Sequence, residues 1–422
     1  MSLKPEDLIS KAEPEITAFK QNFKIADATD LVVEYNGEKL GFIDLVMEGG
    51  GVKGIATAGS VYALERLGFR FRKVAGTSAG AINAILLAAA GNHALEVKSD
   101  AVIKHLTSLD FYEFVDGGSD ARALLNSLNV DSGNFFGRFF KRGKRALALT
   151  RNINDLFGSL GINPGESFRE KISDILFELN KHQHFTCQEL EKQLKAHIDV
   201  LPDTVQIKQD LICEFQLIVA DISKQRKAVF PRDLHMYFKN PDGIHVSDLV
   251  RATMSIPIFF EPFTLEDFHT RASNWKSDTN ITFVDGGVVS NFPLSLYDTK
   301  GNVRPKCPTF GLLIDETKGA TNNYSRKDNE IDNLAELVMA MHQTMQVYGD
   351  KAYIDNHPGA EARIIRLSNW VDLNGKKYPI KTTDFDITSD EKIHLFLNGV
   401  KATLEKLKTW NFKQYIQKYR KP

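Results

Sequence analysis

The sequence predicts an α/β fold: a three-layer α/β/α sandwich with a mainly parallel central sheet, plus a helical cap. Two observations carry this prediction. Residues 42–91 read as a strand, a glycine loop, a helix, a second strand, a sharp turn and a second helix. From residue 165 to residue 408, apolar strands continue to alternate with amphipathic helices. This alternation is typical of a parallel sheet that helices cover on both faces.

The first of these units divides into clear elements. Phe42–Met47 is a short apolar run with the length of a buried strand. After the glycine loop, apolar residues recur every three to four positions, which predicts a helix that Gly68 ends. Phe71–Ala75 is the next strand. The stretch after Gly80 is nearly all apolar, so we expect a buried helix there.

The chain before this unit, residues 1–41, predicts an amphipathic helix around Pro5–Phe23 and then two strands that turn at Asn36-Gly37. This segment is either a packing extension or a regulatory contact. After the unit, residues 92–160 are expected to form a cap. The closing residues Lys408–Lys421 form a basic tail, which we expect to be loosely held.

The other expected elements come from the periodicity of apolar residues. They are helices at Glu166–Leu179, Cys187–His197, Glu330–Val347 and Glu391–Trp410, a hairpin from Leu211–Ala220 to Ala228–Phe230, and strands at 281–284, 309–315 and 363–367.

Composition excludes several classes of protein. The 422 residues are 42% hydrophobic and 25% charged with a net charge of −1, which is ordinary for a globular protein and gives no global signal for nucleic acid. Three scattered cysteines predict neither a zinc site nor a disulfide framework and suggest a reducing compartment. No apolar run reaches eighteen residues and the start is polar, so we expect a cytoplasmic protein, although export without a signal leaves no trace in the sequence. We expect no metal and no cofactor.

Gly76-Thr77-Ser78-Ala79-Gly80 lies between a strand and a helix and matches the nucleophile-elbow pattern. The turn is so tight that side chains two residues either side of the serine would clash, which accounts for Gly76 and Gly80. The serine hydroxyl is then exposed at a helix N-terminus that favours developing negative charge. The alternative is a purely structural glycine turn.

The glycine loop Gly49–Gly54 fits two mechanisms. Its G-x-G-x-x-G spacing matches the dinucleotide fingerprint, but Phe69–Ser78 lacks the acidic residue that would bind the ribose. It is not a phosphate-binding P-loop either, because no Gly-Lys-Ser/Thr follows. Consecutive glycines also let several backbone N–H groups point at one small anion. Because the loop and the elbow follow adjacent strands, we favour an oxyanion hole.

A reactive serine needs a base, and Asp285 is the best candidate. It ends a short apolar strand and precedes Gly286-Gly287, which places a carboxylate at a strand end, where open α/β sheets bind ligands. The second Asp-Gly-Gly, at Asp116, continues into a polar run and reads as a loop. The histidines lack a persuasive context, and we expect them at the surface; those considered are His93, His182, His184, His197, His245 and His269.

These motifs together resemble the patatin-like phospholipase family: Gly-Gly-Gly-x-Lys-Gly, then Gly-x-Ser-x-Gly about 25 residues on, then a distant Asp-Gly-Gly. The resemblance implies a Ser78–Asp285 dyad without histidine. It also implies an oxyanion hole made by the amides of the glycine loop, with Lys53 positioning that loop; the loop residues are Gly49, Gly50, Gly51, Val52, Lys53 and Gly54. One departure is Glu48, where many members have Asp or a neutral residue.

The resemblance extends over about residues 42–408, through the segments Gly161–Phe168, Arg251–Phe263 and Thr383–Gly399. It implies one acyl hydrolase domain with the cap inserted at about 92–160, an N-terminal extension at 1–41 and a tail at 409–422. The implied activity is that of a serine lipid acyl hydrolase of the phospholipase A or lysophospholipase type. Its substrate would be a phospholipid or another acyl lipid.

One part of the cap suggests contact with a membrane. From Ser132 to Asn154 there are six basic residues and no acidic one, with phenylalanines interleaved at helical spacing. Such a helix suits an anionic lipid interface, which would make the protein peripheral at membranes, or packs its aromatic side on the core. The candidate contacts are Phe135, Phe136, Phe139, Phe140, Arg138, Lys141, Arg142, Lys144 and Arg145.

Two other functional hypotheses stay open. The fold could serve as a catalytically silent lipid-binding module, against which the intact serine, aspartate and glycine loop argue. The enzyme could also be inactive until a ligand or an unknown protein partner reorders the cap, which the large insertion permits.

Overall fold

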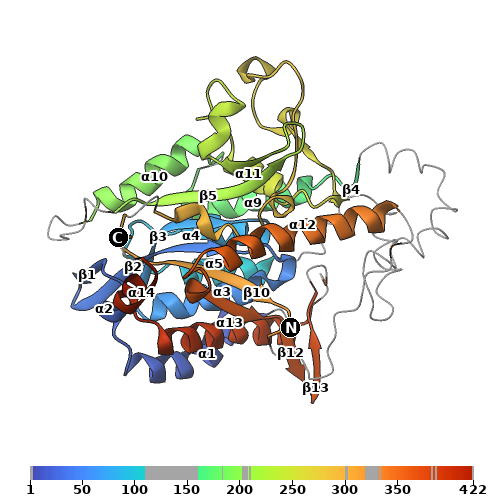
Figure 1. Cartoon of the computed structure of the whole chain (residues 1–422). Helices are drawn as coiled ribbons and strands as arrows, with labels where there is room; N and C mark the ends of the chain where they lie inside the picture. Colours follow the sequence, from blue (N-terminus) through green and yellow to red (C-terminus); the bar gives the residue numbers. More distant parts are fainter. Residues whose placement is uncertain are drawn as a thin grey trace.

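The computed structural model describes residues 3–109, 160–182, 184–201, 208, 211–299, 303–318, 331, 334–381, 384 and 387–420. Within these residues the chain builds a nine-stranded sheet with helices packed on both faces. Figure 1 shows the sheet in the middle of the molecule, with α1 and α13 on one side of it and α9, α10 and α11 toward the opposite end.

Five strands form the parallel part of the sheet, and the others join it antiparallel. The parallel strands are, in spatial order, β11 (Ile364–Ser368), β10 (Thr309–Asp315), β2 (Glu38–Met47), β3 (Phe69–Gly76) and β5 (Glu214–Asp221). The antiparallel strands are β1 (Val32–Tyr35) on β2, β6 (Arg226–Phe230) and β9 (Thr282–Asp285) on β5, and β8 (Phe263–Thr264) on β9. The predicted three-layer α/β/α architecture is confirmed.

Alternation along β2 divides the core into two layers. Ile43, Leu45 and Met47 join the large cluster formed with the helices of one face, whereas Val46 joins the cluster that lies under α12. The helices of the first face are α1 (Pro5–Lys20), α3 (Gly54–Arg66), α4 (Ala79–Ala89) and α13 (Ser389–Thr409), and α12 (Leu334–Asn356) covers the other.

Helices α3 and α13 approach so closely that only glycine fits at their crossing. A Cβ on Gly59 would lie 2.0 Å from the Phe396 carbonyl oxygen, and one on Gly399 would lie 1.9 Å from that of Ala56. This crossing fixes the helix that follows the glycine loop.

The other elements surround this core. They are α2 (Ile25–Ala28), α5 (Ser99–Ser108), α9 (Glu166–Asn180), α10 (Cys187–Asp199), α11 (Val246–Thr253), α14 (Phe412–Tyr419), the paired β4 (Gly161–Asn163) and β7 (Ile258–Phe260), the hairpin β12 (Trp370–Leu373) and β13 (Lys376–Pro379), and the 3-10 turns η1 (Gly51–Lys53), η4 (Arg232–Met236), η5 (Leu265–Asp267), η6 (Ala272–Asn274), η7 (Gly286–Val288), η8 (Leu294–Tyr297) and η9 (Glu361–Arg363).

Residues 3–41 are built into the core. β1 and β2 form the predicted hairpin, and Asn36 and Gly37 turn it with φ of 51° and 79°. Leu8, Ala12 and Ile16 of α1 are buried. This arrangement favours the packing extension over a detachable regulatory segment.

Two expectations about burial were wrong. The chain end is not loosely held: α14 buries Phe412, Tyr415 and Ile416, and the Trp410 ring packs 4.8 Å from that of Phe310. Aromatic side chains at this spacing outweigh the basic residues between them. His197 is also buried, because its ring contacts the Gly91 carbonyl and the Lys98 amine, and desolvation lowers its pKa to about 4.

The predicted strand before Asp285 is present, but its direction differs from the expectation of a parallel sheet. β9 runs antiparallel to β5, and Asp285 pairs with Val219 inside the sheet. Asp285 therefore does not lie at the carboxyl end of a parallel strand. It nevertheless lies near the Ser78 turn, on the other side of β5.

The described helices include none that combines the length and the apolar character needed to span a bilayer. Most of the expected cap, Asp116 and every candidate membrane-contact residue between 135 and 145 lie outside the described residues.

Candidate active site

Ser78 stands in a sharp turn between β3 and α4. Its φ of 52° and ψ of −125° are rare for a residue with a side chain. A Cβ on Gly76 would lie 2.2 Å from the backbone of Gly80, and one on Gly80 would lie 2.3 Å from the Met47 carbonyl oxygen. The two flanking glycines are thus sterically required, as the sequence predicts.

The backbone of this turn is anchored by α11. The Ser78 N–H donates to the Thr253 hydroxyl at 3.0 Å, and that hydroxyl donates to the Ile218 carbonyl of β5 at 2.6 Å. The next residue, Met254, places its sulfur 3.3 Å from the Ser78 hydroxyl oxygen. Ser78 itself is 4% exposed, so the hydroxyl lies in a nearly dry environment.

Asp285 lies across β5 from the serine turn. Gly76 pairs with Leu217 of β5 on one side, and Asp285 pairs with Val219 on the other. The Asp285 N–H donates to the Ser255 carbonyl at 2.9 Å, which ties the aspartate to the chain that follows α11.

The carboxyl of Asp285 is buried near the Ser78 side chain. Burial raises its pKa to about 6, and hydrogen bonds from the Gly287 amide and the Ser78 side chain oppose that rise. The Gly287 N–H lies 2.6 Å from Oδ1. Among the described residues, no histidine is a hydrogen-bond partner of either Ser78 or Asp285.

Gly286 and Gly287 are held tightly after the aspartate. A Cβ on Gly286 would lie 2.1 Å from the Ile218 carbonyl oxygen, and one on Gly287 would lie 2.4 Å from the Gln346 side-chain nitrogen of α12. The glycines let the chain turn directly behind the carboxyl.

The glycine loop follows β2 and lies against the serine turn. A Cβ on Gly49 would lie 3.0 Å from that of Ser78. Gly51 has φ of +55°, and with Val52 and Lys53 it forms the turn η1 that leads into α3. The amides of Gly50 and Gly51 make no hydrogen bond within the described chain, as expected at the start of a helical turn. Free N–H groups of this kind are suited to binding an anionic oxygen.

Lys53 belongs to the same loop, and its side chain runs alongside Gly50 to an acidic partner. Its Nζ lies 3.3 Å from Glu316, beyond the end of β10, and the residue is 4% exposed. The ion pair connects η1 to the neighbouring strand. The loop therefore offers its backbone N–H groups to the site, while the Lys53 side chain ties the loop to the segment after β10.

Asn291 is a site residue that the sequence reasoning did not single out. Its Nδ2 donates to the Gly49 carbonyl and to Glu48, both at 3.1 Å, while its own carbonyl accepts from the Gly49 N–H at 3.1 Å. Burial raises the pKa of Glu48 to about 8. Asn291 thus joins the glycine loop to the segment after Asp285. The sequence feature that could have identified Asn291 as a site residue is its position six residues beyond Asp285.

Comparison with known proteins bears on this arrangement. A family model described as "Patatin-like phospholipase" matches residues 45–297, which contain Ser78, Asp285 and the glycine loop. A curated relative, the uncharacterized protein YqhO of Bacillus subtilis (strain 168), is 31% identical over 372 residues, which are 88% of this chain and 100% of the relative. A solved structure, VipD from Legionella pneumophila, aligns with a TM-score of 0.44 and 17% identity over 90% of this chain and 70% of that chain.

Proposed function

The chain belongs to the patatin-like phospholipase family, and from this premise we propose that it is a serine lipid acyl hydrolase that cleaves fatty-acyl esters of phospholipids. Family membership supports lipid ester hydrolysis in general. The dyad, the oxyanion hole and the phospholipase A or lysophospholipase type are our own assignments.

The observation that carries the proposal is that Ser78 and Asp285 are both buried and lie on either side of β5. A serine hydroxyl is a weak nucleophile until a base accepts its proton. We assign this role to Asp285, and burial brings the pKa of its carboxyl to about 6. An aspartate with a pKa nearer neutrality is a stronger base than an exposed one, yet it is still mainly ionised at pH 7.

In the proposed reaction, Asp285 accepts the hydroxyl proton while the Ser78 oxygen attacks the ester carbonyl. The oxyanion that forms accepts hydrogen bonds from the free amides of Gly50 and Gly51. The leaving alcohol takes the proton from Asp285, which leaves the acyl chain on Ser78. Water then attacks this acyl-enzyme with Asp285 again as base, and the fatty acid departs.

The remaining assigned residues shape the backbone of the site and take no part in proton transfer. Gly76, Gly80, Gly286 and Gly287 permit the two turns, as the close approaches above require. Gly49, Val52, Lys53 and Gly54 complete the oxyanion loop. Since one lost oxyanion donor typically costs on the order of a hundredfold in rate, the loop is expected to carry much of the catalysis.

We also propose that the protein acts at a membrane surface. The basic and aromatic segment at 135–145 remains a prediction. In the described chain, α12 adds a second candidate: Leu337, Met341, Met345 and Tyr348 are exposed and share one helix face. Since Gln346 of the same helix touches Gly287, this apolar strip lies on an element that borders the site.

The decisive experiment is fatty-acid release from mixed phospholipid vesicles by the wild type and by Ser78→Ala, with products identified by mass spectrometry. Release by the wild type alone supports the proposal and shows which ester bond is cut. Release by both proteins contradicts the role of Ser78. No release by a folded wild type, even after addition of a cell lysate, contradicts the hydrolase assignment and favours a silent lipid-binding module, whereas release only with lysate indicates an activating partner.

A further inference from the structure

A second site lies at the opposite end of α11 from Ser78. There the structure has a cavity of about 760 Å³, lined by residues of α9, of the segment before α10, of α11 and of residues 261–270. Ser78, Asp285 and the glycine loop do not line it. The cavity is therefore separate from the candidate active site.

Three histidine rings stack along this cavity. The ring of His245 lies 5.0 Å from that of His184 and 4.3 Å from that of His269, measured between centroids. Asp248, in the first turn of α11, is completely buried beneath them. The stacked imidazoles and the buried carboxylate bring nitrogen and oxygen donors close together.

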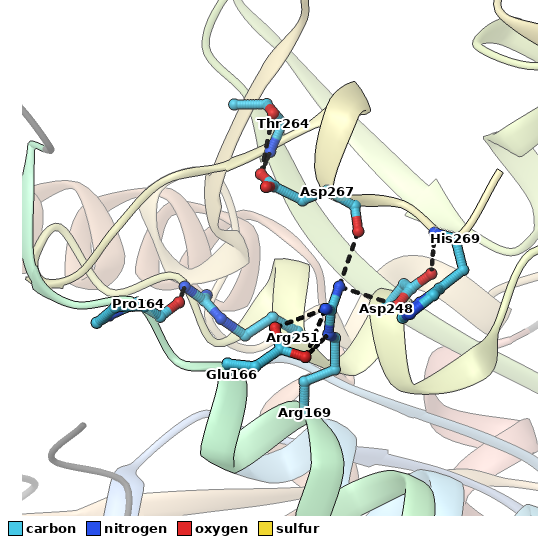
Figure 2. Close-up of polar contacts among 8 residues, drawn as sticks. All are labelled: Pro164, Glu166, Arg169, Asp248, Arg251, Thr264, Asp267 and His269. Carbon is cyan, nitrogen blue, oxygen red and sulfur yellow. Dashed lines mark hydrogen bonds and ion pairs between the residues drawn. The ribbon is translucent and has the colours of Figure 1, made fainter. Parts of the chain in front are cut away.

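Asp248 fixes His269 by two hydrogen bonds. Its Oδ2 accepts from the His269 backbone N–H and its Oδ1 contacts the ring Nδ1, both at 2.8 Å. Figure 2 shows Asp248 between His269 and the guanidinium of Arg169, which lies 3.7 Å from Oδ1. Donor atoms of His245, Asp248 and His269 all lie within 4.8 Å of one another.

We propose that His245, Asp248 and His269 bind a divalent transition-metal ion. Two imidazoles and one carboxylate are a ligand set used by zinc and by other first-row metals. In a tetrahedral site with metal–ligand distances of about 2.0–2.2 Å, the donor atoms lie about 3.3–3.6 Å apart. Any pair of donors near the 4.8 Å limit therefore has to close by roughly 1.2–1.5 Å. The His269 side chain is 44% exposed and has room to make this movement.

The charges around the site suit a cation. Four carboxylates line the cavity against two guanidiniums: Glu166, Glu261, Glu266 and Asp267 against Arg169 and Arg251. Arg169 is already bonded to Glu166 and to the Asp267 carbonyl, as Figure 2 also shows. The N-terminus of α11 disfavours positive charge, and Asp248 in its first turn offsets this.

The metal would be structural for the enzyme. α11 runs from Val246 to Thr253, about 12 Å of helix, and its last residue holds the Ser78 amide. An ion held by His245 and Asp248 would fix the start of the helix whose end positions the serine. No sequence pattern predicted this metal site, because the three ligands are spread over 25 positions with no metal-motif spacing.

The test uses the full chain, freed of metal with a chelator and titrated with Zn²⁺ by calorimetry and with Co²⁺ by visible absorption. We expect one ion per chain and ligand-field bands typical of mixed nitrogen and oxygen ligands. His245→Ala and His269→Ala should each weaken Zn²⁺ binding by at least about tenfold. His235→Ala, which removes an exposed histidine outside the cavity, is the matched control and should bind as the wild type does.

Thermal unfolding separates loss of the site from loss of the fold. Zn²⁺ should raise the melting temperature of the wild type and of His235→Ala but not that of His269→Ala, whose metal-free melting temperature should stay close to wild type. The proposal is overturned if the wild type shows no saturable binding at micromolar Zn²⁺, or if both cluster variants bind it as tightly as the control.

Discussion

The Ser78 N–H donates a hydrogen bond to the hydroxyl of Thr253, 175 positions further along the chain, at a distance of 3.0 Å. Because Thr253 also donates to Ile218 of β5, one hydroxyl joins the serine turn, the end of α11 and the strand that separates Ser78 from Asp285. The strained backbone of Ser78 is therefore held by α11 as well as by its own glycines.

Replacing Thr253 by valine removes this link with almost no change in volume. The buried Ser78 amide and Ile218 carbonyl lose their partners, which should lower the free energy of unfolding by about 1–3 kcal/mol. Activity on a soluble ester should fall between about tenfold and a hundredfold, since small displacements of a nucleophile are costly. Steady-state kinetics and urea unfolding measure both effects. Thr253→Ser keeps the hydroxyl and should remain near wild type; equal losses in the two variants would show that the hydrogen bonds do not matter.

Asp285→Asn tests the base directly. The amide keeps the shape and can still accept from the Gly287 N–H, but it cannot take the proton of Ser78. We expect ester hydrolysis to fall by about a thousandfold or more, with an unchanged circular dichroism spectrum. Exposed Asp372→Asn is the control for the chemical change itself. Near wild-type turnover in Asp285→Asn would reject the dyad and direct attention to Asp116 or to a histidine.

The same carboxyl predicts the pH dependence of the rate. With a pKa of about 6, Asp285 is ionised and able to accept a proton above pH 6, and it is protonated below. The value of kcat/KM on a soluble ester should therefore fall about tenfold per pH unit below pH 6 and level off above it. A profile that stays flat down to pH 4.5, where the protein is still folded, would contradict Asp285 as the base.

The raised pKa also predicts an effect on stability. Because the folded-state pKa lies above the ordinary value of 3.8, the folded state holds the proton more tightly, and the carboxyl costs stability as pH rises through about 6. Asp285→Asn removes this cost, so it should be more stable than wild type by about 1–3 kcal/mol at pH 8, with the difference shrinking toward pH 4. Denaturant unfolding at both pH values measures this, and Asp372→Asn should show no such trend.

The sequence predicted those parts of the site that depend on local chain geometry. The elbow at Ser78 needs glycines at fixed offsets, and these offsets are visible in one short motif. Asp285 was also identified, but partly for a wrong reason, because the direction of β9 is decided by its pairing with β5 and not by its own residues.

Contacts between segments far apart in the sequence could not be predicted from local sequence patterns. Asn291, Thr253 and the group of His245, Asp248 and His269 acquire partners only when segments far apart in sequence meet. The burial of His197 and of α14 was mispredicted for the same reason. Both have polar neighbours in the sequence, but in the folded chain their neighbours are apolar or hydrogen-bonded groups.

The exposed strip of α12 gives a last prediction, on lipid surfaces. Met341→Ser with Met345→Ser removes two apolar side chains that are 55% and 46% exposed, so the fold should lose little, whereas a membrane would lose two anchoring groups. We expect vesicle binding measured by co-sedimentation to weaken at least about tenfold and hydrolysis of vesicle lipid to fall with it, while a soluble short-chain ester is cleaved as before. Ile212→Ser with Ile222→Ser is the matched control, since these side chains are 55% and 47% exposed beside β5. If both double variants bind vesicles like wild type, α12 does not contact the membrane; if both weaken equally, general surface hydrophobicity and not this helix accounts for binding.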